Sequence, residues 1–214
     1  EIEVELPSSA ALAVQEGVAE EGAESSASLH YKERAVTIAL VNALVEQGEY
    51  RPARRLLGDA AKKGPPALAL ALMRLHLTFG AIEAAENALA LSEKRGASSE
   101  ALILHRGFLA LAKGDHGPAA DLFTEALSKE AGNVTAATNL ALCLLYSKQL
   151  VRAVETLENV IRAEPCKAMT YPAVFNLCTL YDLQGGEGHH KKQMMRSLVK
   201  MFAPEDFDVA ACKL

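Results

Sequence analysis

Four segments of the sequence repeat one pattern of small and apolar residues at a nearly constant interval. Three of them contain a glycine, a short spacer, an alanine and an apolar stripe, at 47–65, 79–97 and 113–132. The fourth, 148–165, lacks the glycine and keeps the rest. The alanines that align between the copies are 32, 34 and 34 residues apart: Ala53, Ala85, Ala119 and Ala153. This period constrains the chain to stack copies of one small unit, each covering its neighbour's apolar face.

A period near 34 residues is typical of the tetratricopeptide repeat (TPR), in which each unit is a helix–turn–helix. Glycine falls where the first helix of a unit has to end, at Gly48, Gly80 and Gly114, because glycine adopts positive φ at little cost. Proline falls early in the second helix, at Pro52 and Pro118, where a missing N–H costs little. The pattern predicts an all-α fold, an α-α superhelix (TPR solenoid). The alternative is a generic bundle of alanine- and leucine-rich helices, which four copies in phase argue against.

The phase of the repeats also predicts the domain organisation. Residues 1–28 are expected to hold the end of a preceding helix and an acidic linker, before a helix that opens near Leu29. Residues 168–214 are expected to form a degenerate fifth helix pair, shifted by a three-residue insertion, and a C-terminal tail that caps the last apolar face. The chain begins with Glu1, so we expect it to be a region of a longer protein. Between these ends, TPR repeats occupy 29–167, with units at about 34–65, 66–99, 100–133 and 134–167.

The charge of the chain is distributed unevenly. The net charge is −5, but residues 1–31 contain seven glutamates and no lysine or arginine, so the remainder has 22 basic against 27 − 7 = 20 acidic residues. This balance argues against a dedicated nucleic-acid-binding protein, which carries a basic face. The apolar run at 67–77 is interrupted by Arg74 and is shorter than the roughly 20 residues of a membrane span.

The chemically reactive residues form no recognised catalytic or metal-binding pattern. The SxxK spelling at 197–200 lacks its partner motifs, the glycine-rich run at 185–188 lacks a preceding strand, and the pair at 189–190 lacks a third metal ligand. We therefore expect no enzyme, no cofactor, no metal and no small-molecule substrate. The cysteine spacing matches no zinc module and indicates idle thiols in a reducing compartment, with a disulfide or metal role as the lesser alternative, for Cys143, Cys166, Cys178 and Cys212.

The concave face of a TPR array is lined by the first helix of each unit, and partners bind there. The chaperone-binding TPR clamp needs five basic or amide residues at set positions, of which only Asn42 is present, so a chaperone-tail clamp is excluded. A largely apolar groove favours a helix or an apolar peptide, although the chain's own flanking segments could fill it instead. The expected groove residues are Asn42, Arg74, His105, Phe108, Asn139, Leu142, Tyr146 and Asn176.

A basic helix is expected near the C-terminus. Residues 189–202 contain four positive charges and no acidic residue: Lys191, Lys192, Arg196 and Lys200. One interpretation is a solvated helix face, and the other is a contact with an acidic protein surface or an anionic membrane. Reversing the charge of Lys191 and Lys192 should weaken partner recovery without lowering helicity if the second interpretation holds.

Segments outside the repeat pattern carry a family resemblance. They are "LAVQEGVAEEG" (12–22), "LALCLLY" (140–146), "FNLCTLYDL" (175–183), "KKQ" (191–193) and "CKL" (212–214). With these segments, nearly the whole chain from about Ala10 resembles the C-terminal TPR region of the trafficking protein particle (TRAPP) complex subunit 12 family. The chain departs from that family in the loop at 185–190 and lacks the upstream half.

The resemblance implies a non-catalytic scaffold subunit of a multisubunit vesicle-tethering complex, in ER-to-Golgi transport and autophagy. The implied partners are other TRAPP subunits, with an indirect association with a Rab GTPase and with membranes. The implied location is cytoplasmic, peripheral to the ER–Golgi intermediate compartment and Golgi membranes. The alternative function is a stand-alone TPR adaptor that binds a helix or apolar peptide in its groove. RNA binding is disfavoured, because the groove supplies Arg74 as its main basic residue.

Overall fold

The structure is a computed structural model that describes residues 26–186 and 188–213, and every regular element within them is helical. The predicted segment 1–28 lies outside the described residues except for its last three, which belong to the first helix. That helix therefore begins three residues before Leu29. The helices are α1 (Ser26–Glu46), α2 (Tyr50–Lys63), α3 (Pro66–Leu77), α4 (Ile82–Lys94), α5 (Ser99–Lys113), α6 (His116–Lys129), α7 (Val134–Tyr146), α8 (Leu150–Ala163), α9 (Pro165–Ala168), α10 (Tyr171–Gln184), α11 (Gly188–Phe202) and the 3₁₀ helix η2 (Val209–Cys212).

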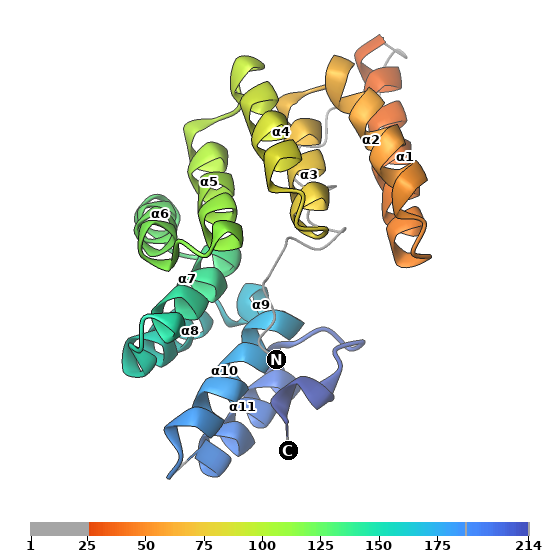
Figure 1. Ribbon diagram of the computed structural model, residues 1–214. Coiled ribbons are helices and arrows are strands. Elements are labelled where there is room, and N and C mark those ends of the chain that lie inside the picture. Colours follow the sequence, from red (N-terminus) through yellow and green to blue (C-terminus); the bar gives the residue numbers. More distant parts are fainter. Residues whose placement is uncertain (1–25, 187, 214) are drawn as a thin grey trace. The chain divides into compact units, whose positions relative to one another are not determined.

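The described residues form two compact units, which divide between His105 and Arg106, within α5. We call them the N-terminal unit (26–105) and the C-terminal unit (106–213). In the N-terminal unit, α1 packs against α2, α2 against α3, and α3 against α4 (Figure 1). In the C-terminal unit, α6, α7 and α8 pack in succession, and α10 packs on α8 and α11. Sequential helix pairs of this kind are those of an α-α TPR superhelix.

The turns within the predicted units have one backbone geometry. Gly48, Gly80 and Gly114 have φ values of 77°, 66° and 84°, where only glycine is free of steric strain. The fourth turn has no glycine, and Lys148 takes its place with φ 60°. The N–H of Lys148 donates to the Leu145 carbonyl at 2.9 Å, as that of Gly114 does to the Leu111 carbonyl at 3.0 Å. The turn therefore keeps its shape even where the sequence departs from the pattern.

The core is made of small residues that let the helices approach closely, and of larger side chains between them. The four aligned alanines Ala53, Ala85, Ala119 and Ala153 are each 0% exposed. The larger side chains four positions later are buried in every copy: Leu57, Leu89, Phe123 and Leu157. Gly107 shows how tight this packing is, because a Cβ there would come within 2.7 Å of the Phe123 ring.

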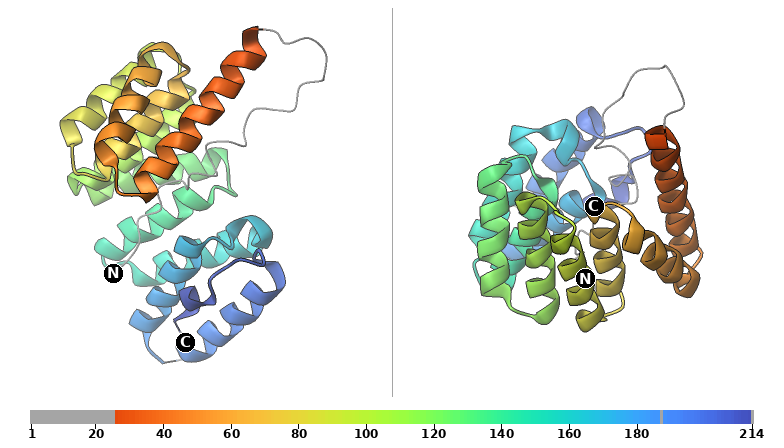
Figure 2. Two further views of the ribbon diagram at one scale, coloured as in Figure 1. Left: turned by 90° about the vertical axis from the view of Figure 1, so that its right-hand side faces the viewer. Right: turned by 90° about the horizontal axis from the view of Figure 1, so that it is seen from above.

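The C-terminal unit ends in a cap built from α10, α11 and η2. α10 packs against α11, as the left view of Figure 2 shows, and η2 packs on both of them. Lys192 of α11 is 8% exposed; its ammonium group lies 2.7 Å from Asp182 Oδ1 and donates to the Lys213 carbonyl at 2.9 Å. Both cysteines in this region, Cys178 and Cys212, are fully buried and reduced. One lysine thus holds the C-terminal turn against the last helix pair.

Candidate partner-binding surfaces

A buried pair of basic side chains lies in the N-terminal unit. Arg74 of α3 is 8% exposed and His105 of α5 is 5% exposed. His105 Nδ1 lies 2.7 Å from the Ala101 carbonyl oxygen, so Nδ1 carries the ring proton and donates it. Nε2 is then an acceptor, and the Arg74 guanidinium donates to it through Nη1 at 2.7 Å. The hydrogen bonds therefore fix the tautomer of the imidazole.

The protonation states of this pair follow from its burial. Burial and the neighbouring Arg74 charge lower the pKa of His105 to about 4, and burial lowers the pKa of Arg74 to about 10. At neutral pH the imidazole is neutral and the guanidinium is charged. Arg74 Nη2 is buried and has no hydrogen-bond partner among the described residues. Among the described residues, a neutral acceptor alone holds this buried cation, an arrangement that is energetically costly.

The other groove residues differ in how accessible they are. In the N-terminal unit, Asn42 of α1 is half-buried. In the C-terminal unit, Phe108 is 2% exposed and packs 5.7 Å from the Phe123 ring. Tyr146 is 62% exposed, with its ring stacked 4.3 Å from that of His116. The remaining three predicted groove residues, Asn139, Leu142 and Asn176, are buried between packed helices.

The four basic residues predicted at the C-terminus do not form one exposed patch. Lys192 is engaged inside the cap, as described above, so reversing its charge would place a second carboxylate next to that of Asp182. Lys191 is half-buried, 3.7 Å from Glu158 Oε1 and 5.0 Å from the centre of the Tyr181 ring. Arg196 and Lys200 are exposed. A test of this surface by charge reversal therefore has to leave Lys192 unchanged.

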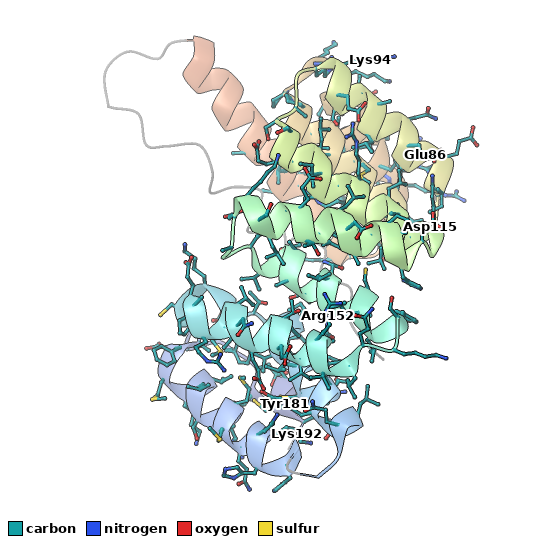
Figure 3. All side chains as sticks on the ribbon, turned by 90° about the vertical axis from the view of Figure 1, so that its left-hand side faces the viewer. Glu86, Lys94, Asp115, Arg152, Tyr181 and Lys192 are labelled. Atoms are coloured by element: carbon teal, nitrogen blue, oxygen red, sulfur yellow. The ribbon has the colours of Figure 1, made fainter. Side chains whose placement is uncertain are left out.

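A cleft of about 640 Å³ in the C-terminal unit was not anticipated from the sequence. It lies between α8 and α11, with α9 and α10 contributing to its walls. Figure 3 labels Tyr181 and Lys192 on the two helices next to it. The sequence signals that could have indicated it are the three-residue insertion before α10 and the methionine pair in α11. The lining residues are Glu158, Ile161, Arg162, Pro165, Met169, Tyr181, His190, Lys191, Met194, Met195 and Leu198.

The described residues offer neither a metal site nor a membrane span. Within 26–186 and 188–213, no group of three or more His, Cys, Asp or Glu side chains is placed to hold a metal ion. None of the helices over the same residues combines the length and apolarity that a membrane span requires. Cys166 is the one exposed thiol among the four cysteines, and all four are free.

Comparison with solved structures shows which fold these helices form. A thermophilic TPR protein of Thermus thermophilus superposes with a TM-score of 0.62 at 18% identity, over 83% of this chain and 98% of that one. The pilF protein of Pseudomonas aeruginosa gives a TM-score of 0.57 at 16% identity, over 86% and 81% of the two chains. A family model described as tetratricopeptide repeat matches residues 110–168. These matches establish the TPR fold.

Curated sequences match nearly the whole chain, including segments outside the region that matches the repeat model. The chain is 26% identical over 220 aligned residues to trafficking protein particle complex subunit 12 of Mus musculus, an alignment that includes 94% of this chain and 28% of that protein. The Homo sapiens protein of that name matches at 26% over 94% of this chain and 30% of its own length. The chain thus spans less than a third of these relatives. The chain has the tetratricopeptide-repeat fold, and its sequence is similar, over nearly its whole length, to part of trafficking protein particle complex subunit 12.

Proposed function

We propose that the chain is a non-catalytic scaffold that joins subunits of a TRAPP-type vesicle-tethering complex. The observation that carries this proposal is the similarity to subunit 12, which includes 94% of the chain and is not confined to residues 110–168 that match the repeat model. A TPR array presents a large surface on rigid helices, which suits a subunit that holds others in place. Such a role fits ER-to-Golgi transport and autophagy, with the protein peripheral to ER–Golgi intermediate and Golgi membranes.

The scaffold proposal is tested by affinity purification of the tagged protein, expressed at its native level. TRAPP subunits should be recovered in fixed proportion to the bait. A Tyr146→Ala variant tests the groove, because Tyr146 is 62% exposed and its loss should leave the fold intact. A variant that charges Phe108 is unsuitable, since Phe108 is buried. Recovery of no TRAPP subunit with the unaltered chain would refute the proposal.

A second candidate function is a stand-alone adaptor that binds a peptide in the N-terminal unit. Arg74 favours it, because a carboxylate of a bound peptide would neutralise the buried guanidinium and pair with Nη2. An adaptor of this kind should recover a partner other than TRAPP subunits, and an Arg74→Met variant should lose that partner while retaining helicity. Arg51→Met is the matched control, because it removes an exposed charge from α2 and leaves the groove residues unchanged. Equal recovery by both variants would exclude Arg74 as the determinant.

A further inference from the structure

The cleft between α8 and α11 exists because the repeat pattern is broken between the fourth and fifth helix pairs. The extra residues there form the single turn α9 (Pro165–Ala168), and two residues of this stretch, Pro165 and Met169, line the cleft. Neighbouring second helices of a regular solenoid would pack against each other without the added turn. The insertion therefore separates α8 from α11 and leaves room between them that no described side chain fills.

The floor of the cleft is apolar and its α11 side continues as an exposed stripe. Ile161, Met169 and Met195 are buried, at 4%, 3% and 4% exposure. On α11, Met194 and Leu198 are four residues apart and Met201 follows at seven, so all three lie on one helix face. Met194 is 56% exposed and Met201 is 65% exposed. Exposed apolar stripes next to a cleft mark interaction sites.

The rim of the cleft carries an excess of positive charge. Glu158 is the one acidic residue in its lining, and its Oε1 accepts a hydrogen bond from the Tyr181 hydroxyl at 3.0 Å. Its carboxylate also lies between two cations, with Lys191 Nζ at 3.7 Å and Arg162 Nη2 at 3.7 Å. Both distances exceed those of a strong charged hydrogen bond. Two cations thus share one carboxylate, and the charge of the rim is complementary to an additional acidic group.

We propose that this cleft docks one amphipathic α-helix of a partner protein, with its apolar face against the methionines and an Asp or Glu side chain between Arg162 and Lys191. In helix-in-groove binding, the bound helix contacts the groove through apolar residues at i, i+3, i+4 and i+7. The stripe on α11 has a matching spacing. Methionine side chains are flexible and polarisable, so the floor adapts to anchors of different shape. This proposal does not depend on which complex the chain belongs to.

The concave shape of the site favours a protein helix over a membrane surface. Ile161, Met169 and Met195 lie at the bottom of the cleft and are almost fully buried. A lipid headgroup plane can meet the exposed Met194 and Met201, but it cannot reach these three side chains without entering between α8 and α11. Contact with the buried methionines is therefore the property that distinguishes the proposed occupant.

The methionine methyl groups provide a direct test, because the chain has five methionines and three of them line the cleft. The full chain, labelled with ¹³C at the methionine methyls, is titrated with a synthetic 18-residue helix that carries Leu at i, i+3, i+4 and i+7, Glu beside this stripe, and Ala and Gln elsewhere. The resonances of Met169, Met194 and Met195 should shift together with one dissociation constant. Met73 of α3 is the internal control, and its resonance should not move.

Variants separate the cleft from the rest of α11. Met194→Glu places a carboxylate in the stripe at an exposed position. It should raise the dissociation constant of the peptide by about tenfold or more. Arg196→Glu changes the charge on the opposite side of the same helix and should change the affinity less than about twofold. A peptide with Lys in place of Glu should bind about tenfold more weakly. Circular dichroism verifies that both variants keep the helicity of the parent chain.

Other occupants give different results, each of which overturns the proposal. Phosphatidylserine vesicles that shift Met169 and Met195 without peptide would indicate a lipid site. Shifts that grow with protein concentration, together with a dimer in sedimentation velocity, would indicate a second copy of the chain. A synthetic peptide of residues 1–25 that shifts the same resonances more tightly than the designed helix would indicate an internal occupant. No shift at Met169 and Met195 with any helix would show that the cleft binds none.

Discussion

The two units follow one repeat pattern but depart from it in different ways. In the N-terminal unit the turns after α1 and α3 have glycine at positive φ. The exception is inside the unit, where Arg74 is buried with no carboxylate partner among the described residues. In the C-terminal unit the buried lysine, Lys192, is paired with Asp182. The departures that set this unit apart affect the backbone: Lys148 at a glycine position and the added turn α9. A buried charged residue changes the electrostatics inside a regular array. A change in the backbone, such as an inserted turn, opens space between helices.

This difference between the units indicates where binding sites form in a repeat protein. Regular helix pairs bury their own apolar faces, as the fully buried alanines of all four copies show, and leave little room for a ligand. Both candidate sites lie where the pattern fails, at a charged residue on a first helix and at an inserted turn. Units that differ in this way should also differ in stability and in their response to pH.

The largest expected effect comes from truncating one core side chain in each unit. Phe123→Ala should lower the free energy of unfolding of the C-terminal unit by about 3–5 kcal/mol, and Met73→Ala that of the N-terminal unit by about 2–5 kcal/mol, because both side chains are 0% exposed. Hydrogen exchange resolved by segment is the measurement. Loss of protection should be confined to the unit that carries the substitution. Equal loss in both units would show that they unfold together.

A smaller effect is expected from the lysine that closes the cap. Lys192→Met keeps the length of the side chain and removes its contacts with Asp182 and the Lys213 carbonyl, at a cost of about 2–3 kcal/mol. The turn η2 should open, so Cys212, now 0% exposed, should react faster with a thiol reagent. Lys200→Met is the control, because that lysine is exposed. An unchanged labelling rate of Cys212 in the Lys192 variant would contradict this account.

The N-terminal unit should lose stability on mild acidification because of His105. Its folded-state pKa of about 4 lies below the ordinary value of 6.5, so the unfolded chain binds more protons between these values. The free energy of unfolding should therefore fall as the pH is lowered through this window, by about 2 kcal/mol between pH 7 and pH 5. Denaturant unfolding followed by hydrogen exchange of 66–105 measures it. His105→Gln should remove most of this dependence of the unfolding free energy on pH. An unchanged dependence would show that another group causes it.

The spacing of the repeats was sufficient to predict the fold. Alanines at 32- and 34-residue intervals mark helix contacts in which a larger side chain would not fit, and all four are fully buried. The glycine positions likewise predicted the turns, because positive φ is a local property of the backbone. The repeat boundaries and the groove assignment remain predictions, since binding was inferred from positions in the repeat and no ligand contact tests them.

The candidate sites were less predictable because they depend on contacts between distant residues. Lys192 reads as an exposed cation in the sequence, but its partners are Asp182 on another helix and a carbonyl 21 positions away. Phe108 reads as a groove residue, yet Phe123 packs against it. The cleft depends on how far α9 separates two helices. None of these facts is encoded in a local pattern.

The smallest predicted effect concerns the one turn that lacks glycine. Lys148 has φ 60°, a conformation that costs a side-chain-bearing residue about 1 kcal/mol. Lys148→Gly should therefore stabilise the C-terminal unit by about 0.5–1 kcal/mol, reduced from the full strain by the greater freedom of glycine in the unfolded chain. Gly114→Ala is the reciprocal variant: a Cβ there meets nothing within 4 Å, so the backbone alone should destabilise it by about 1 kcal/mol. Urea unfolding of both variants measures the pair. If Lys148→Gly destabilised the chain instead, the lysine side chain would contribute a contact that outweighs the strain, and the fourth turn would differ from the other three in more than its sequence.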